Sequence, residues 1–179
     1  MKVLISADST CDLSAALREK FNIGIVPLYI EREGKNYRDG VDITPQDIFD
    51  YVGAGHGVCR TAAVNTGDYL ERFSAWRKEY DAVIHFNISS EMSSCYQNAC
   101  AAAAECENVH VVDSRNLSTG SRLLVLEAAG RDAAGEDTAA IGKRMRERAG
   151  KGEGKRGSAP APTRKSGKGG GGEEGGSGS

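Results

Sequence analysis

The sequence has no long apolar run, and its cysteines do not follow the spacing of a metal site or a disulfide framework. No apolar stretch approaches the roughly 18–20 residues that span a bilayer. The N-terminal segment turns acidic at Asp8, before the apolar core of a signal peptide could form. The cysteines number five and include no Cys-x-x-Cys pair. These absences predict a cytoplasmic protein with packed thiols and no bound metal.

Phosphate-binding loops are also missing. No Gly-x-Gly-x-x-Gly follows an apolar run, and there is no Walker-type Gly-Lys-Ser/Thr. The sequence therefore predicts no nucleotide and no other cofactor. Net charge gives a second exclusion, because residues 1–149 carry −5 while residues 150–179 carry +3. A mildly acidic body lacks the basic face typical of a nucleic-acid-binding protein.

The chain divides into two parts by composition. Residues 150–179 hold twelve glycines, six Lys or Arg, three Glu and no apolar side chain larger than alanine or proline. Such a segment buries too little apolar surface to offset the entropy of ordering it, so we expect a disordered tail. Residues 1–149 are long enough for one core and form the predicted folded domain.

Apolar β-rich runs alternate with helical patterns along the domain. Strands are expected at 2–7, 23–30, 82–88 and 108–112, and a turn at 33–35 that returns along 36–38 predicts a small hairpin arm. Helices are expected at 15–21, 92–106, 119–134 and 138–149, and two more begin at Thr44-Pro45 and near Thr66. This alternation predicts an α/β domain with a mostly parallel sheet and helices on both faces. Pro27 favours an edge position for its strand or a locally unpaired N–H.

Short hydroxyl side chains follow three of the predicted strands. These groups are Ser9 and Thr10; Ser89, Ser90, Ser93 and Ser94; and Ser114, Ser118 and Thr119. Each group alone is what helix N-caps require. Together they would meet at the carboxyl edge of a parallel sheet, where ligands of such folds bind. Hydroxyls beside helix N-termini suit a carboxylate or a phosphate, so the residues predict an anion-binding crevice.

The same segments resemble the DegV family of fatty-acid-binding proteins, in particular its N-terminal domain. The matching motifs, in chain order, are Asp8-Ser9-Thr10-Cys11-Asp12-Leu13, Val26-Pro27-Leu28, Tyr37-Arg38-Asp39-Gly40-Val41-Asp42-Ile43, Arg60-Thr61-Ala62-Ala63, residues 88–99 (ISSEMSSCYQNA) and residues 111–120 (VVDSRNLSTG). Their order and spacing match the family across about 1–135.

The resemblance implies a cytosolic two-domain carrier with a long-chain fatty acid buried between the domains and no catalytic base of its own. It places Thr61 and Ser93 as the hydrogen-bond donors to the carboxylate. Ser9, Ser90 and Ser94 are weaker candidates, chosen for their place on the same rim. In one branch of the family the carrier presents the acid to a separate fatty acid kinase.

Two features depart from the family pattern. Ala62-Ala63-Val64 replaces a commoner Ser-Gln-Pro, and Ser93-Ser94-Cys95 replaces a commoner Ser-Gly-Thr. The second domain has no counterpart in residues 150–179, which suggests a truncated chain. Two alternatives stay open, a small α/β hydrolase or phosphotransferase using the same crevice, and a fragment without function. His85 and His110 lie inside predicted strands, where packing is the expected role.

Overall fold

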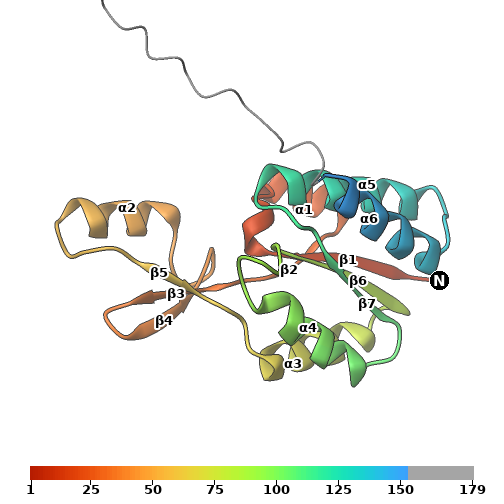
Figure 1. Ribbon diagram of the computed structural model, residues 1–179, viewed down its shortest axis with the longest axis horizontal. Helices are drawn as coiled ribbons and strands as arrows, with labels where there is room; N and C mark the ends of the chain where they lie inside the picture. The colour runs from red at the N-terminus through yellow and green to blue at the C-terminus, as the bar shows by residue number, and fades with distance from the viewer. Residues whose placement is uncertain (153–179) are drawn as a thin grey trace, which may run out of the picture.

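The computed structural model describes residues 1–152, which form a body and an arm that projects from it (Figure 1). The body is built on a four-stranded sheet in the order β2-β1-β6-β7, and every neighbouring pair is parallel. The strands are β1 Val3–Asp8, β2 Gly24–Val26, β6 Ala82–Asn87 and β7 Val109–Asp113. All six residues of β6 are buried, as expected for a central strand covered on both faces.

Helices cover both faces of this sheet. On one face lie α1 Ala15–Phe21, α5 Thr119–Ala133 and α6 Thr138–Gly152, and on the other lie α3 Thr66–Arg77 and α4 Cys95–Ala104 (Figure 1). Each face has its own apolar core, one including Ile84, Val125 and Met145 and the other including Phe73 and Ala99. The predicted α/β class with helices on both faces of a parallel sheet is confirmed.

The arm is an antiparallel sheet with one helix. Its elements are β3 Tyr29–Arg32, β4 Lys35–Arg38, α2 Pro45–Gly53 and β5 Arg60–Ala62, and the strand order is β4-β3-β5. The predicted hairpin is present, with positive φ at Glu33 and Gly34 as a two-residue hairpin turn requires. Thr44 and Asp47 form a capping box at the start of α2, where Pro45 is the first residue.

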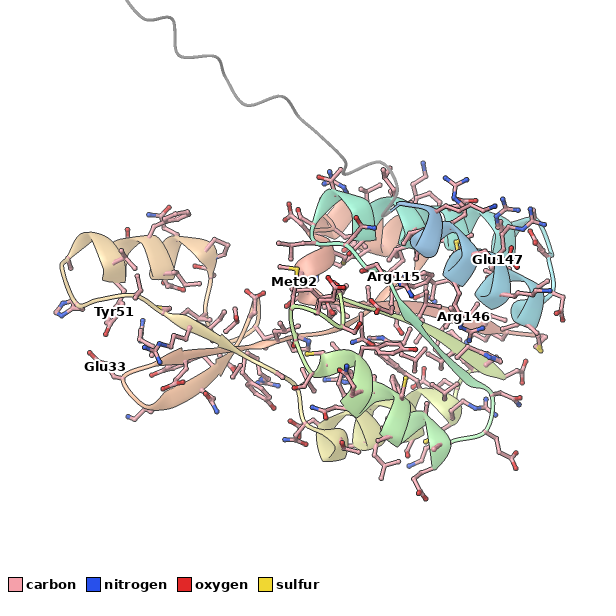
Figure 2. All side chains as sticks on the ribbon, viewed as in Figure 1. Glu33, Tyr51, Met92, Arg115, Arg146 and Glu147 are labelled. Carbon is pink, nitrogen blue, oxygen red and sulfur yellow. The ribbon has the colours of Figure 1, made fainter. Side chains whose placement is uncertain are left out.

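Stacked side chains hold α2 over the hairpin. The Arg32 guanidinium lies 4.9 Å from the ring centroid of Tyr37 and 5.2 Å from that of Tyr51. The Tyr51 hydroxyl donates to the Glu33 carboxylate at 3.3 Å, and Figure 2 labels both residues on the arm. The Arg32 guanidinium thus joins α2 to the hairpin through contacts with two aromatic rings.

The single strand expected over 23–30 is wrong, because the chain leaves the parallel sheet at Pro27. β2 ends at Val26 and β3 begins at Tyr29 in a different sheet. Pro27 has no N–H to donate, and the Leu28 amide donates to the Ser9 hydroxyl at 3.1 Å instead of to a strand. The expected edge position is confirmed, since within residues 1–152 β2 pairs only with β1. β5 was not predicted.

A short 3₁₀ helix, Ser9–Cys11, follows β1 directly, and α6 continues three residues past the predicted domain end. The predicted tail begins within α6, and residues 153–179 lie outside the described residues. No helix within residues 1–152 is long and apolar enough to cross a bilayer. All five cysteines are free, with Cys11 and Cys95 buried.

Candidate ligand-binding rim

The carboxyl ends of β1 and β6 lie side by side at the point where the sheet changes direction. From β1 the chain goes outward to β2, and from β6 it goes outward to β7 on the opposite side. Ligands of open parallel sheets bind at such a switch point. Asp8 ends β1 here and is 1% exposed. Its carboxylate accepts hydrogen bonds from the Ile88 amide at 2.6 Å and from the amide and hydroxyl of Thr10.

Through these bonds the Asp8 carboxylate connects the segment after β1 with the loop after β6. Burial raises the pKa of the Asp8 carboxyl, and its hydrogen bonds to Thr10 and Ile88 act in the opposite direction. The side-chain amide of the neighbouring Asn87 donates to the Tyr69 hydroxyl at 2.8 Å. Asp8 therefore fixes the geometry of this edge of the sheet. It was not predicted as a site residue, although it directly follows the strand predicted over 2–7.

A second carboxylate links the loops after β6 and β7. The Ser90 hydroxyl and the Ser90 amide both donate to Asp113, the amide at 3.2 Å. Asp113 also accepts from the Arg115 amide at 2.9 Å. Because the Ser90 hydroxyl proton is already committed to a carboxylate, Ser90 has no proton left to donate to an anionic ligand.

Backbone and hydroxyl groups complete the connection between the three loops. The Ser89 amide donates to the Asn116 carbonyl at 3.1 Å, and the Ser118 amide donates to the Thr10 carbonyl at 3.1 Å. The hydroxyls of Ser114, in the loop after β7, and Ser121, in α5, lie 2.9 Å apart. The hydroxyl groups after β1, β6 and β7 thus lie along one edge of the sheet, and several of them hold that edge together.

Ser93 and Ser94 stand where the chain enters α4. The Ser93 oxygen accepts from the Cys95 amide at 3.2 Å, which leaves its proton available to donate. Ser94 is the N-cap residue of α4 but makes no side-chain cap bond, and it is exposed. These two hydroxyls, unlike that of Ser90, have protons to offer a ligand.

Thr61 lies outside the parallel sheet. It is exposed, occupies the middle of β5 and pairs with Ile30 in the arm. The connection from β5 to α3 is held to α4, because the Asn98 side chain donates to the Val64 carbonyl at 2.8 Å. The Asn98 amide in turn donates to the Ser94 carbonyl at 3.0 Å. The chain three residues after Thr61 is therefore held to the first turn of α4, which begins just after Ser94.

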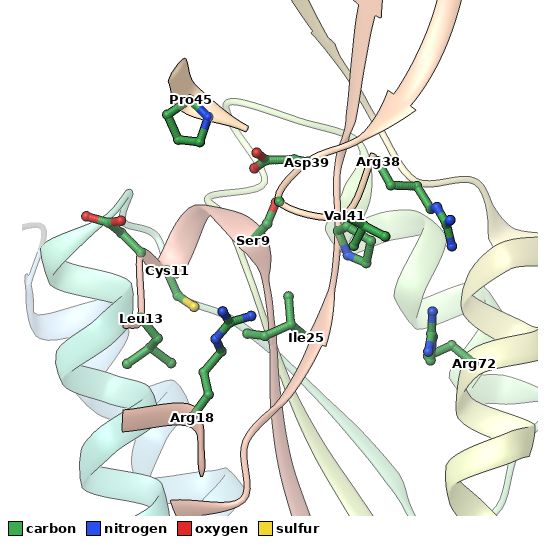
Figure 3. A pocket seen from close by; sticks show the side chains of 13 residues that line it. Ser9, Cys11, Leu13, Arg18, Ile25, Arg38, Asp39, Val41, Pro45 and Arg72 are labelled. Atoms are coloured by element: carbon green, nitrogen blue, oxygen red, sulfur yellow. The ribbon is translucent and has the colours of Figure 1, made fainter. Parts of the chain in front are cut away.

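Ser9 is separated from the other candidates by its surroundings. It lines a cavity of about 600 Å³ between body and arm, to which Cys11, Ile25 and Pro27 also contribute (Figure 3). The other four candidate residues do not line this cavity. The five predicted residues thus do not all surround one cavity.

The histidines give no support to a hydrolytic triad at the rim. His85 is fully buried, its Nδ1 lies 2.9 Å from the Ser6 hydroxyl, and its ring meets Tyr69 and Phe73 edge-on. Burial lowers the pKa of His85 to about 3, so the ring is neutral and packed in the core. His56 stacks on Tyr51 in the arm. The expected packing role of His85 is confirmed.

Fold and rim together define an open parallel α/β domain with a polar, hydroxyl-bearing edge at its switch point. The family model described as "Uncharacterised protein, DegV family" matches residues 2–153. The chain belongs to the DegV family.

Relatives and solved structures agree with this assignment. A DegV domain-containing protein of Clostridium perfringens is 36% identical over 130 residues, which cover 72% of this chain and 47% of the relative. One of Clostridium acetobutylicum is 37% identical over 129 residues, with 71% and 46% covered. The chain therefore spans about half the length of these relatives.

Two of the similar solved structures are of proteins described as binding fatty acid or lipid. A DegV family protein of Thermus thermophilus, described for its fatty acid binding, superimposes with a TM-score of 0.73 at 32% identity, covering 82% of this chain and 54% of that one. A DegV lipid-binding protein of Thermotoga maritima gives a TM-score of 0.76 at 28% identity, covering 85% and 55%. The resemblance read from the motifs is thereby confirmed.

Proposed function

We propose that this chain is the head-group half of a cytoplasmic, non-enzymatic fatty-acid carrier, in which Thr61 and Ser93 donate hydrogen bonds to the carboxylate. Family membership and the fatty-acid-binding T. thermophilus and T. maritima proteins support the ligand class. The observation that carries the assignment of the site is the Asn98–Val64 bond, which ties the segment after Thr61 to the helix that begins just after Ser93.

The five candidate hydroxyls differ in what they can give a carboxylate. Ser93 and Ser94 keep a donor proton, while the Ser90 proton is taken by Asp113. In the proposal Thr61, Ser93 and Ser94 meet the head group, and Ser90 shapes the loop. Ser9 lines the cavity between body and arm, which the other four do not, and is the weakest of the five.

Most of the binding free energy would come from the hydrocarbon chain. Each buried methylene contributes about 0.8 kcal/mol, whereas a hydrogen-bonded head group contributes roughly 1–3 kcal/mol. The head-group residues would then set orientation, holding the carboxylate where a separate fatty acid kinase can reach it. Because this chain spans about half of its relatives, the full affinity requires the other half of the tunnel wall.

Native mass spectrometry of the purified chain, followed by lipid extraction, tests the proposal. We expect a co-purifying fatty acid that is lost in the Thr61→Ala/Ser93→Ala double variant and kept in Ser74→Ala, which removes an exposed hydroxyl from α3. Retention of the acid by the double variant would refute the assignment of the site. Turnover of simple esters or phosphates would favour the hydrolase or phosphotransferase, and neither ligand nor turnover would favour a fragment without function.

A further inference from the structure

The cavity between body and arm has the features of a separate anion site. Its volume is about 600 Å³, within the range of small-molecule sites. It lies at the free edge of β2, and its walls come from the segment after β1, from α1 and α3, and from the loop that joins β4 to α2 (Figure 3). Among the proposed head-group residues it contains Ser9 alone.

Three arginines from three elements line this cavity. Arg38 ends β4 and is neutralised, because its Nε and Nη2 donate to the two oxygens of Asp42 at 2.8 and 2.9 Å. Arg18 on α1 and Arg72 on α3 approach the opening from the two faces of the sheet (Figure 3). Within residues 1–152 neither has an ion-pair partner, and Arg72 only approaches the Trp76 ring, at 5.8 Å.

Ser9 adds a hydrogen-bond donor to the cavity that these two arginines line. Its oxygen accepts from the Leu28 amide at 3.1 Å, so its own proton is free to donate into the cavity. Two guanidinium groups that form no ion pair within residues 1–152, together with a hydroxyl donor, match a dianionic phosphate, which arginine binds through paired N–H groups.

The rest of the cavity restricts what the phosphate is attached to. Asp12 and Asp39 also line it, and their carboxylates would repel a second anion but accept hydrogen bonds from hydroxyl groups. Leu13, Ile25 and Val41 provide apolar surface for a carbon skeleton. We propose that this cavity binds a sugar phosphate, with the phosphate between Arg18, Arg72 and Ser9 and the sugar hydroxyls on Asp12 and Asp39.

This site is independent of the proposed fatty-acid site. The sugar phosphate would bridge residues of the body and of the arm, so its binding would also reduce movement between them. Thr61 and Ser93 take no part in it, and the two proposals can therefore fail separately.

The experiment is an NMR titration of the ¹⁵N-labelled full chain with ribose 5-phosphate, with ribose and inorganic phosphate as separate probes. Ribose 5-phosphate should shift the amides of Ser9, Ile25 and Gly40 and should bind more tightly than either probe. The Arg18→Gln/Arg72→Gln variant should lose about tenfold or more in affinity. Lys143→Gln, which removes an exposed charge from α6, should bind as the wild type does.

The proposal would be overturned by no binding of ribose 5-phosphate, by equal binding of ribose, or by unchanged affinity in the double arginine variant. Inorganic phosphate binding as tightly as ribose 5-phosphate would also overturn it, because the sugar would then contribute nothing. Circular dichroism checks that each variant is folded. Fatty acid should co-purify with the arginine variant to the wild-type extent, whatever the titration shows.

Discussion

The carboxylate of Asp8 accepts a hydrogen bond from the Ile88 amide at 2.6 Å, across the point where β1 and β6 end side by side. This contact joins two segments that are 80 residues apart in the chain. A second carboxylate, Asp113, does the same for the loops after β6 and β7 through Ser90. The two carboxylates therefore hold this edge of the sheet together. The Thr10 and Ser90 hydroxyls donate their protons to them, so only other hydroxyls keep protons for a ligand.

Removing the Asp8 carboxylate should destabilise the domain. Asp8→Ala leaves the Ile88 and Thr10 amides without their acceptor, and an unsatisfied buried donor costs about 1–3 kcal/mol. We expect the free energy of unfolding in urea to fall by about 2–4 kcal/mol. Asp50→Ala, at an exposed position of α2, should change it by no more than about 0.5 kcal/mol. Similar values for the two variants would show that the Asp8 bonds contribute little.

The neutral core histidine predicts a pH dependence with a defined sign. The folded-state pKa of His85 is about 3, while its ordinary value is 6.5, so between these values the unfolded chain binds the additional proton. The contribution of His85 to stability is therefore complete above pH 6.5 and is lost as the pH falls toward 3. Within that window its slope is about 1.4 kcal/mol per pH unit.

Urea unfolding of wild type and His85→Gln at a series of pH values measures this slope. The difference in unfolding free energy between the two proteins should shrink as the pH falls, because the variant has no imidazole at position 85. His56→Gln is the matched control, since His56 is exposed in the arm, and it should follow the wild-type curve. Parallel curves for wild type and His85→Gln would contradict the low pKa of His85.

Two glycines of α5 should respond oppositely to the same substitution. A Cβ at Gly120 would lie 2.5 Å from Cγ of Asn116, a residue of the rim network, whereas a Cβ at Gly130 would meet nothing. Gly120→Ala should cost about 1–3 kcal/mol through overpacking, and Gly130→Ala should stabilise by roughly 0.5–1 kcal/mol through helix propensity. Thermal unfolding of both variants is the measurement, and shifts of the same sign would refute the prediction.

Periodicity and caps predicted most of the body because they act locally. Thr44 and Pro45 begin α2 as the sequence predicts, and the apolar run of 82–88 contains β6, one of the two inner strands of the sheet. The break at Pro27 and the existence of β5 depend on long-range pairing. β5 has only three residues, too few to show an alternating pattern in the sequence. It is a strand because it pairs with β3.

The sequence predicted where the candidate hydroxyls lie in the sheet, but not which of them have a proton free to donate to a ligand. The sequence placed hydroxyls after β1, β6 and β7, and they do lie along one edge. Whether a hydroxyl proton is free depends on partners distant in sequence, such as Asp113 for Ser90 and Leu28 for Ser9. Arg18 and Arg72 carry no motif at all, and only the fold brings them to one cavity.

Asn98 should act as a positioning residue for fatty-acid binding. Its side chain donates to the buried carbonyl of Val64, so Asn98→Ala releases the segment after Thr61 from α4. We expect a stability loss of about 1 kcal/mol and a clear decrease in co-purifying fatty acid, because the two proposed donors would no longer be held in register. The loss of lipid should be smaller than in the Thr61→Ala/Ser93→Ala variant, since both hydroxyls remain.

A control of equal instability separates positioning from general loosening. Ser14→Ala removes the α1 cap, at a cost of about 1 kcal/mol, on the opposite face of the sheet from α4. If Asn98 acts through position, Ser14→Ala keeps its fatty acid while Asn98→Ala loses it, and the amide resonance of Thr61 shifts in Asn98→Ala alone. Equal lipid loss in the two variants would mean that stability, and not the hold of Asn98 on Val64, governs binding.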